Sequence, residues 1–422
     1  MGLHLGGARL RPSGPWHTVR VDQWVWPAYI GVIGGVVLFA LVFVPALIVQ
    51  VRRYGSLSLA RLLGTAALAV YAVALVAYTL LPLPTGDLSV WCVEHGVSGA
   101  QLNPLQFIDD IRSQTAGMGI TAAAASRVVL QVVFNVLLFI PFGLFTRRFV
   151  GRGVVFATVA AFAVSAAIEA TQYTGIWGLI GCSYRVADVD DLIANTLGGL
   201  LGALIAPLVL AWMPQSRDLA RRRLTPRPVT ARRRWAGMLI DAFGFLVSGA
   251  VLVIGWRMVM LGLGRDLGET HEWTEWALQF AVPLSVVFAL PPAMGGGASW
   301  GQRAVWLVPV RRDGRGLGPV QRFGRAWIVG GLWAALQCVQ AAPPVSEGWS
   351  DRASIAAVLI GAAAVVAVVC TRDRRGLSGM MSGARIVDAR AAEDDDDCGQ
   401  DAGSAIGAPP ADRRPADCPA DC

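Results

Sequence analysis

The sequence predicts an all-α integral membrane protein, a polytopic helix bundle with about nine transmembrane helices in two units. Of the 422 residues, 55% are hydrophobic and only 15% are charged, and the mean hydropathy is +0.53. This composition is too apolar for a soluble globular protein. Apolar runs of span length recur along the chain, and arginines gather in alternate loops between them. We therefore expect each apolar run to form a helix that crosses a bilayer.

The apolar runs set the expected helices and the division of the chain. Spans are expected at about 26–50, 60–81, 128–146, 154–172, 191–212, 236–260, 276–293, 326–342 and 354–370. The predicted organisation is an amino-terminal segment with the first helix (1–57), a first membrane domain (58–212), a basic linker (213–233), a second membrane domain (234–387) and an acidic tail expected to be disordered (388–422).

The distribution of charge predicts the orientation in the membrane. Arginines collect after the first, third and fifth expected spans, and the loops between them are acidic or nearly neutral. Basic loops stay in the cytoplasm, so the amino terminus is expected outside and the carboxyl terminus inside a bacterial cytoplasmic membrane. The net charge of +7 comes from arginine alone, since the sequence has no lysine. We expect these arginines to lie next to the bilayer and to bind no nucleic acid.

The seven cysteines and four histidines predict no metal site and no cofactor. They form no CxxC pair and no metal-ligand spacing. Cys92 and Cys182 both fall in loops expected outside, where a disulfide between them is possible.

Polar residues crowd two of the expected helices near the middle of the chain. Ionisable groups in a membrane are costly unless they are paired or hydrated, so a dense cluster of them predicts a functional site. Asn135, on the preceding helix, offers a further polar face, and Pro141 predicts a kink below it. The candidate ligand-binding residues are Asn135, Glu169, Gln172, Arg185, Asp188, Asp191 and Asn195.

The topology places this cluster near the outer surface. Gly198 and Gly202 continue the face of Asp191 and Asn195, and small residues at this spacing let a neighbouring helix approach closely. Arg185, the only strong cation in the loop, is expected to bridge two carboxylates. The alternative is that the set only joins helices, with Asp188 or Asp190 capping the fifth one. For Asp190 we favour the cap.

The motifs of residues 58–212 resemble those of the VanZ-like family. They are N-V-L-L-F-I-P-F-G from Asn135, E-x-x-Q from Glu169, R-x-x-D-x-D-D from Arg185 and N-T-L-G from Asn195. The family is named for a protein that raises resistance to teicoplanin, a lipid-tailed glycopeptide. The resemblance implies a membrane protein whose shared polar positions are the seven candidates above.

Residues 230–390 resemble the RDD family, some members of which are credited with ion transport. The resemblance rests on Arg234 and Asp241, on Gly301, Arg303 and the Asp313-Gly314 pair in a loop expected in the cytoplasm, and on the segment from Arg374 to Val387. Arg234 and Asp241 lie two turns apart on one helix face, where they can pair or reach Arg303 and Arg325. The alternative, which we favour, is a set of snorkelling arginines and one satisfied aspartate. The secondary cytoplasmic polar set is Arg234, Asp241, Arg303 and Arg325.

These patterns favour a non-enzymatic protein that engages a membrane lipid or lipid-tailed ligand in the outer leaflet. The family resemblance extends this to lipoglycopeptide resistance or envelope homeostasis. An ion or proton antiporter using Glu169 and Asp241 is the alternative. A membrane hydrolase is a third reading, although no GxSxG, HExxH or Cys/His pairing supplies a nucleophile or metal, and we predict no catalytic residue. The sequence leaves the oligomeric state open.

Overall fold

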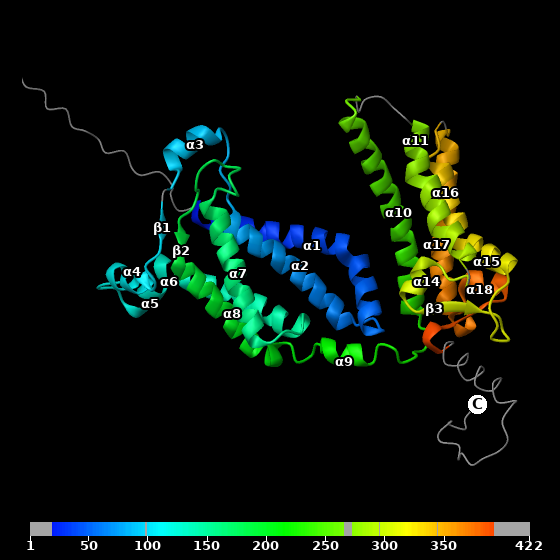
Figure 1. Ribbon diagram of the computed structural model, residues 1–422, viewed down its shortest axis with the longest axis horizontal. Coiled ribbons are helices and arrows are strands. Elements are labelled where there is room, and N and C mark those ends of the chain that lie inside the picture. The colour runs from blue at the N-terminus through cyan, green and yellow to red at the C-terminus, as the bar shows by residue number, and fades with distance from the viewer. Residues whose placement is uncertain (1–18, 98, 266–271, 295, 344, 392–422) are drawn as a thin grey trace, which may run out of the picture. The chain divides into compact units, whose positions relative to one another are not determined.

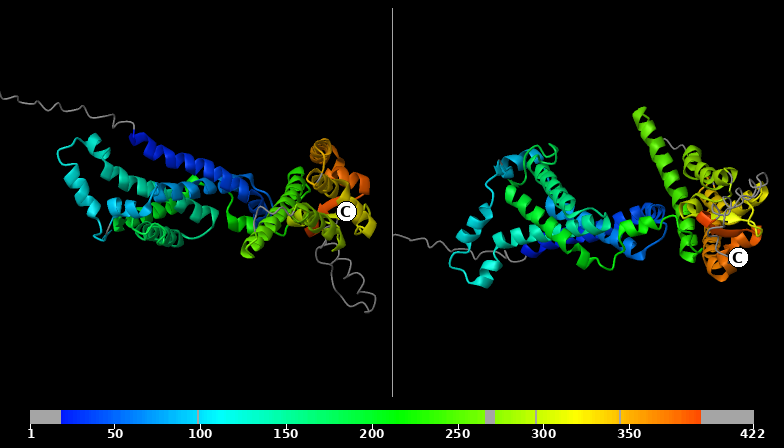
Figure 2. Two further views of the ribbon diagram at one scale, coloured as in Figure 1. Left: turned by 90° about the horizontal axis from the view of Figure 1, so that it is seen from above. Right: turned by 60° about the horizontal axis from the view of Figure 1, so that its bottom comes forward.

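The computed structural model describes residues 19–97, 99–265, 272–294, 296–343 and 345–391 (Figures 1 and 2). Residues 1–18 of the predicted amino-terminal segment and residues 392–422 of the predicted tail lie outside the described residues. The described chain is mainly helical with only two small two-stranded sheets, which confirms the all-α membrane fold. It contains eight helices long and apolar enough to cross a membrane: Trp26–Tyr54, Leu59–Leu80, Arg127–Phe149, Val154–Tyr173, Val189–Val209, Ala231–Gly262, Glu272–Ala293 and Glu347–Cys370.

The expected ninth span, 326–342, is not among these eight. This stretch is helical but is divided into α15 (Pro319–Ala326), η4 (Trp327–Gly331) and α16 (Leu332–Gln340). Arg325 precedes this stretch and Gln337 and Gln340 lie within it, and such polar side chains lower the mean hydropathy of a helix. The stretch from Pro319 to Gln340 is nonetheless an unbroken run of helical segments, so its crossing of the membrane, which the predicted orientation requires, stays a prediction.

The chain divides into two compact units, and each is described by itself. Unit 1 comprises residues 1–46 and 58–221, and unit 2 comprises residues 47–57 and 222–422, within the limits of the described ranges. The elements of unit 1 are α1 (Val19–Tyr54, whose last residues count with unit 2), α2 (Leu59–Leu80), α3 (Leu88–His95), β1 (Ala100–Gln101), α4 (Gln106–Gln114), α5 (Ile120–Ala124), α6 (Arg127–Leu144), η1 (Phe145–Phe149), α7 (Val154–Tyr173), β2 (Ala187–Asp188), α8 (Val189–Val209) and α9 (Ser216–Arg221).

Helix α8 packs closely against α6 and α7 because glycines line its contact faces. A Cβ atom on Gly198 would lie 2.2 Å from the Val136 carbonyl oxygen, and one on Gly202 would lie 2.0 Å from the Ile140 carbonyl oxygen. These positions confirm the predicted close approach, and the partner is α6. Phe139 is completely buried beside them. The packing holds the first turns of α8 against the polar faces of its neighbours.

Unit 2 contains long helices with several short elements gathered at one end of them (Figure 1). Its core includes Phe245, Val287, Phe288 and Ala334. Its elements are α10 (Ala231–Gly262), α11 (Glu272–Trp276), η2 (Ala277–Ala281), α12 (Val282–Leu284), η3 (Ser285–Ala289), α13 (Leu290–Ala293), α14 (Trp300–Ala304), β3 (Leu307–Val310), α15, η4, α16, α17 (Glu347–Cys370), η5 (Arg372–Arg374), α18 (Gly376–Ser382) and β4 (Arg385–Asp388).

Asp388, where the disordered tail was expected to begin, lies inside unit 2. It ends β4, which pairs antiparallel with β3 so that Asp388 faces Leu307. Its buried carboxylate accepts from Arg233 at 2.9 Å and from Arg390 at 2.6 Å. Burial would raise the pKa of Asp388, but the hydrogen bonds from Arg390 and the charge of Arg233 lower it below its ordinary value. This arrangement, the Asp388 anchor, fastens the described end of the chain to α10.

Candidate functional site

The candidate residues of unit 1 converge where α2 and α7 end and α8 begins. We call this set the polar cluster: Asn135, Glu169, Gln172, Arg185, Asp188, Asp191 and Asn195. Its members come from three long helices and from the loop that joins α7 to α8. Hydrogen bonds join residues of α6, α7, α8 and the connecting loop within this cluster.

The two polar residues at the end of α7 are buried and hold neighbouring segments in place. Glu169 Oε2 accepts a hydrogen bond of 3.0 Å from the Asp188 backbone amide. Gln172 Nε2 donates to the Thr79 carbonyl oxygen at 2.6 Å, near the end of α2. Since buried polar groups need such partners, these bonds set the position of the loop and of α2 against α7.

The two polar residues of α8 reach different helices. Asn135 on α6 donates to the carboxylate of Asp191. Asn195 Nδ2 donates to Ser165 Oγ on α7 at 2.9 Å, inside the bundle. Within the described residues the Asn195 Oδ1 atom has no hydrogen-bond partner. One face of α8 thus joins α6 near the surface and α7 one turn deeper.

Of the two aspartates considered as caps of α8, Asp188 and not Asp190 has that role. Asp188 is the N-cap of α8, and its Oδ1 accepts from the Asp190 amide at 2.8 Å. Burial and the neighbouring carboxylates raise the pKa of Asp188, although that amide opposes the shift. Asp190 instead accepts from the backbone amides of Leu105 and Phe107 at 2.6 and 2.8 Å. The favoured cap at Asp190 was wrong because the 101–107 loop folds back onto α8 and supplies donors that the sequence did not reveal.

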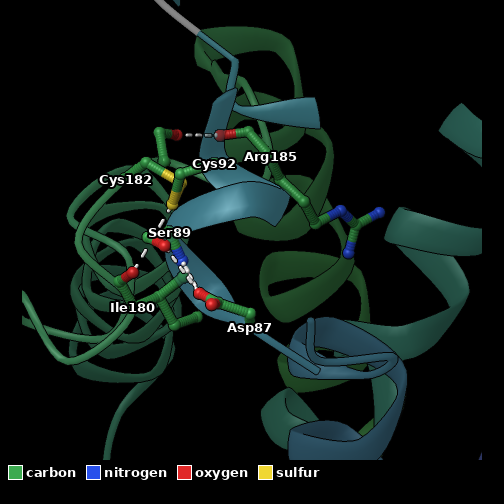
Figure 3. Close-up of a disulfide and its surroundings, with 7 residues drawn as sticks. Asp87, Ser89, Cys92, Ile180, Cys182 and Arg185 are labelled. Carbon is green, nitrogen blue, oxygen red and sulfur yellow. Dashed lines mark hydrogen bonds between the residues drawn. A yellow bond between two sulfur atoms is a disulfide. The ribbon is translucent and has the colours of Figure 1, made fainter. Parts of the chain in front are cut away.

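Arg185 does not form the predicted carboxylate bridge. Its Nη1 donates to the Thr79 carbonyl oxygen at 2.9 Å, and none of the ion pairs found among the described residues includes it. Figure 3 shows its guanidinium extending away from the disulfide that joins Cys92 to Cys182. The Cα atoms of these cysteines are 5.8 Å apart, so the pairing left open by the sequence is made. The disulfide fastens α3 to the loop that carries Arg185.

The polar cluster therefore has two parts. Glu169, Gln172 and Asn195 are buried and act as ties between segments. The other four, Asn135, Arg185, Asp188 and Asp191, are half-buried or, for Arg185, exposed. These four offer amide, guanidinium and carboxylate groups to a polar ligand. Among the residues that the structure describes, no group of three His, Cys, Asp or Glu side chains is placed to hold a metal.

Comparison with known families covers this same region. Residues 68–210 match the VanZ/LLP1 family. The match contains every member of the polar cluster and agrees with the resemblance that the motifs carried. No curated protein and no solved structure matches the chain. The match ends before the second unit, so it gives no support to the RDD resemblance of residues 234–387.

Several residues of the VanZ-like region that support the site were missed by the sequence analysis. The Thr79 carbonyl accepts from both Gln172 and Arg185, and Ser165 accepts from Asn195. Gln101, in β1, donates to Asp190 at 3.3 Å. A backbone carbonyl carries no sequence signal, but Ser165 lies four residues before Glu169 on one helix face and could have been found by that spacing.

The secondary polar set of unit 2 is only partly assembled. Arg234, Asp241 and Arg325 line one cavity, whereas Arg303 does not and instead donates to the Ala298 carbonyl oxygen at 3.1 Å. Asp241 accepts from Ser299 Oγ and from the Gly301 amide, each at 2.6 Å. Of the alternatives left open by the sequence, Asp241 is the satisfied aspartate, because Ser299 and Gly301 at the start of α14 donate to its carboxylate.

Proposed function

We propose that this chain is a non-enzymatic protein of a bacterial cytoplasmic membrane whose VanZ-like unit binds the polar head of a lipid-like molecule in the outer leaflet. The arginine distribution supports an outside amino terminus and a cytoplasmic carboxyl terminus. The disulfide beside the polar cluster supports the same orientation, because disulfides persist on the oxidising side of a membrane.

The observation that carries the proposal is the exposed side chain of Arg185 in the same polar cluster as two half-buried acidic residues, Asp188 and Asp191. Arg185 has one hydrogen bond to a backbone carbonyl, which leaves other N–H groups for an anionic or hydroxyl-bearing head group. The carboxylates suit ammonium or sugar hydroxyl groups. The buried ties behind them hold these groups at fixed positions, and acyl tails would lie along the apolar helix surfaces.

The VanZ/LLP1 match supports a connection with antibiotic resistance. We propose that binding at the polar cluster reduces the effect of a lipid-tailed glycopeptide such as teicoplanin. The protein would do so by excluding the drug or by changing its access to cell-wall precursors. A general contribution to envelope homeostasis is the broader form of this proposal.

The test is the protection of a susceptible strain that expresses the protein. Arg185→Ala should abolish protection against teicoplanin, and Arg185→Lys should restore part of it, with protein abundance measured for each variant. Arg112→Ala is the matched control, because Arg112 is an exposed arginine whose ion pair among the described residues is with the equally exposed Asp109, at 3.7 Å. Full protection by the Arg185→Ala variant at normal abundance would contradict the proposal.

An ion or proton antiporter is the second candidate, favoured by the buried carboxylates Glu169 and Asp241 in helices of span length. It accords with the RDD-like reading of residues 234–387. Proteoliposomes containing a pH-sensitive dye should then show proton movement when Na⁺ is added, and Asp241→Asn should remove it. A preparation that binds teicoplanin but moves no protons would favour the first candidate.

A further inference from the structure

Unit 2 contains a cavity that the lipid-binding function proposed for unit 1 does not use. Its volume is about 400 Å³, within the range of small-molecule sites, and α10, η3, α13, η4 and α17 contribute to its wall. Most of the lining is apolar, including Val287, Phe288 and Trp333. We call it the arginine cavity because Arg234 and Arg325 are its only cationic lining residues in the described chain.

Both arginines are buried with hydrogen-bonding capacity left over. Arg234 is 3% exposed and Arg325 is 5% exposed. Arg325 Nη1 donates to the Gly297 carbonyl oxygen and Arg234 Nη2 to the Arg375 carbonyl oxygen, each at 3.1 Å. Within the described residues, Arg325 Nε, Arg325 Nη2 and Arg234 Nε have no partner. Buried guanidinium groups in this state are unfavourable unless an acceptor reaches them.

The one carboxylate in the cavity wall leaves this capacity unfilled. Both oxygens of Asp241 already accept hydrogen bonds, and the ion pairs of the described residues do not include it. Two guanidinium groups and one carboxylate leave the wall with one excess positive charge. Burial and the charge of Arg234 lower the pKa of Arg325 to about 9, so it remains charged at neutral pH. The missing acceptor should therefore carry negative charge.

The apolar part of the cavity reaches the outer surface of the helices. Trp235 and Leu239 on α10 and Val365 on α17 line the cavity and are also exposed. In a bilayer these exposed side chains face acyl chains. An occupant can therefore enter from the membrane between α10 and α17, with its charged end toward the arginines and its chain along the apolar wall.

We propose that the arginine cavity binds a membrane amphiphile with a phosphate head group, the phosphate accepting hydrogen bonds from Arg234 and Arg325. Guanidinium groups recognise phosphate oxygens through paired N–H donors, which matches the free N–H groups of the two arginines. The apolar wall distinguishes this occupant from free phosphate. This site is independent of the polar cluster and of the function proposed for it.

The test uses the purified full chain in a neutral detergent with three probes: dioctanoyl phosphatidic acid, dioctanoyl phosphatidylcholine and inorganic phosphate. Phosphatidic acid should bind most tightly, and its Kd should rise at least about tenfold in Arg325→Gln, because a buried charge-assisted hydrogen bond is lost. Arg322→Gln, three residues earlier on α15 and outside the cavity wall, is the matched control and should leave the Kd unchanged.

A second variant guards against loss of fold in Arg325→Gln. Gly361 lines the cavity, and a Cβ atom there would meet nothing within 4 Å. Gly361→Leu should occupy the space of the acyl chain and weaken phosphatidic acid without affecting inorganic phosphate. Equal affinity for phosphatidic acid and inorganic phosphate would overturn the proposal, as would unchanged phosphatidic acid binding in both variants.

Discussion

Arg233 and Arg234 are neighbours on α10, and both are buried, yet they have different surroundings. Arg233 Nη2 lies 2.9 Å from a carboxylate oxygen of Asp388 and also donates to the Val305 carbonyl oxygen at 2.9 Å. Arg234 lines a cavity and donates to a single backbone carbonyl. Burial alone therefore does not distinguish a structural arginine from a binding one. The distinction lies in the N–H groups that the protein leaves without an acceptor.

The polar cluster of unit 1 shows a similar division. Glu169 and Gln172 are buried and form hydrogen bonds with backbone groups. Arg185 is exposed, and its guanidinium donates a hydrogen bond to one backbone carbonyl oxygen. In each unit, paired polar groups join the helices, and a few less satisfied groups are the ones for which we propose a ligand. The following predictions test whether this division is real.

The largest effect is expected from Asp388→Ala. Removing this carboxylate leaves Arg233 and Arg390 buried without their counter-charge, which should lower the free energy of unfolding of unit 2 by about 3–5 kcal/mol. Faster hydrogen exchange in β3 and β4 would report the change. Asp351→Ala, at an exposed position of α17, should have almost no effect. Equal losses of unfolding free energy in the two variants would show that the Asp388 anchor does not stabilise unit 2.

The neighbouring arginines should respond differently to the same substitution. Arg233→Gln should cost about 3 kcal/mol, because it breaks a buried ion pair. Arg234→Gln should cost less than about 1 kcal/mol, since it also removes an uncompensated buried charge. Thermal unfolding of the two purified variants measures the difference. Similar losses would show that Arg234 is a structural residue like Arg233.

A smaller difference is expected in unit 1 between Asp190→Ala and Arg185→Ala. Asp190 accepts from two backbone amides, so its removal should cost about 2 kcal/mol and speed hydrogen exchange at Leu105 and Phe107. Arg185→Ala should cost less than about 1 kcal/mol because its side chain is exposed. If Arg185→Ala destabilised the unit as much as Asp190→Ala, Arg185 would be a structural residue, which would contradict the binding role proposed for it.

The smallest expected effect is the dependence of the stability of unit 2 on pH, which should be seen only in acid. The pKa of Asp388 is lower in the folded state than in the unfolded state. The stabilisation that its carboxylate provides is therefore complete above the unfolded-state pKa and is lost as the pH falls through the folded-state pKa. The contribution of Asp388 to the free energy of unfolding of unit 2 should therefore be constant from about pH 8 to 5 and should decline in stronger acid. Asp388→Asn should lack that decline when unfolding is followed against pH. A variant with the same acid profile as the unmodified chain would assign the decline to other groups.

The sequence predicted the helices better than their partners. Hydropathy located the spans, and the glycine spacing of α8 correctly predicted its close packing, because both depend on side-chain type alone. The role of Asp190 was missed because its donors are backbone amides of a loop, and Arg185 likewise reaches a backbone carbonyl. Asp388 was placed in the tail because an acidic, aperiodic segment follows it. The arginine cavity could not be predicted, since its walls come from segments distant in the sequence.

The contact between α6 and α8 also limits which mutations the gene can tolerate. Every single-base change of a glycine codon that alters the residue introduces a larger side chain or a stop. At Gly198 and Gly202 each such side chain would begin within 2.2 or 2.0 Å of a carbonyl oxygen on α6. The two codons therefore have no tolerated single-base replacement that leaves this contact in place. Variation in this helix pair has to arise at other positions or through paired changes.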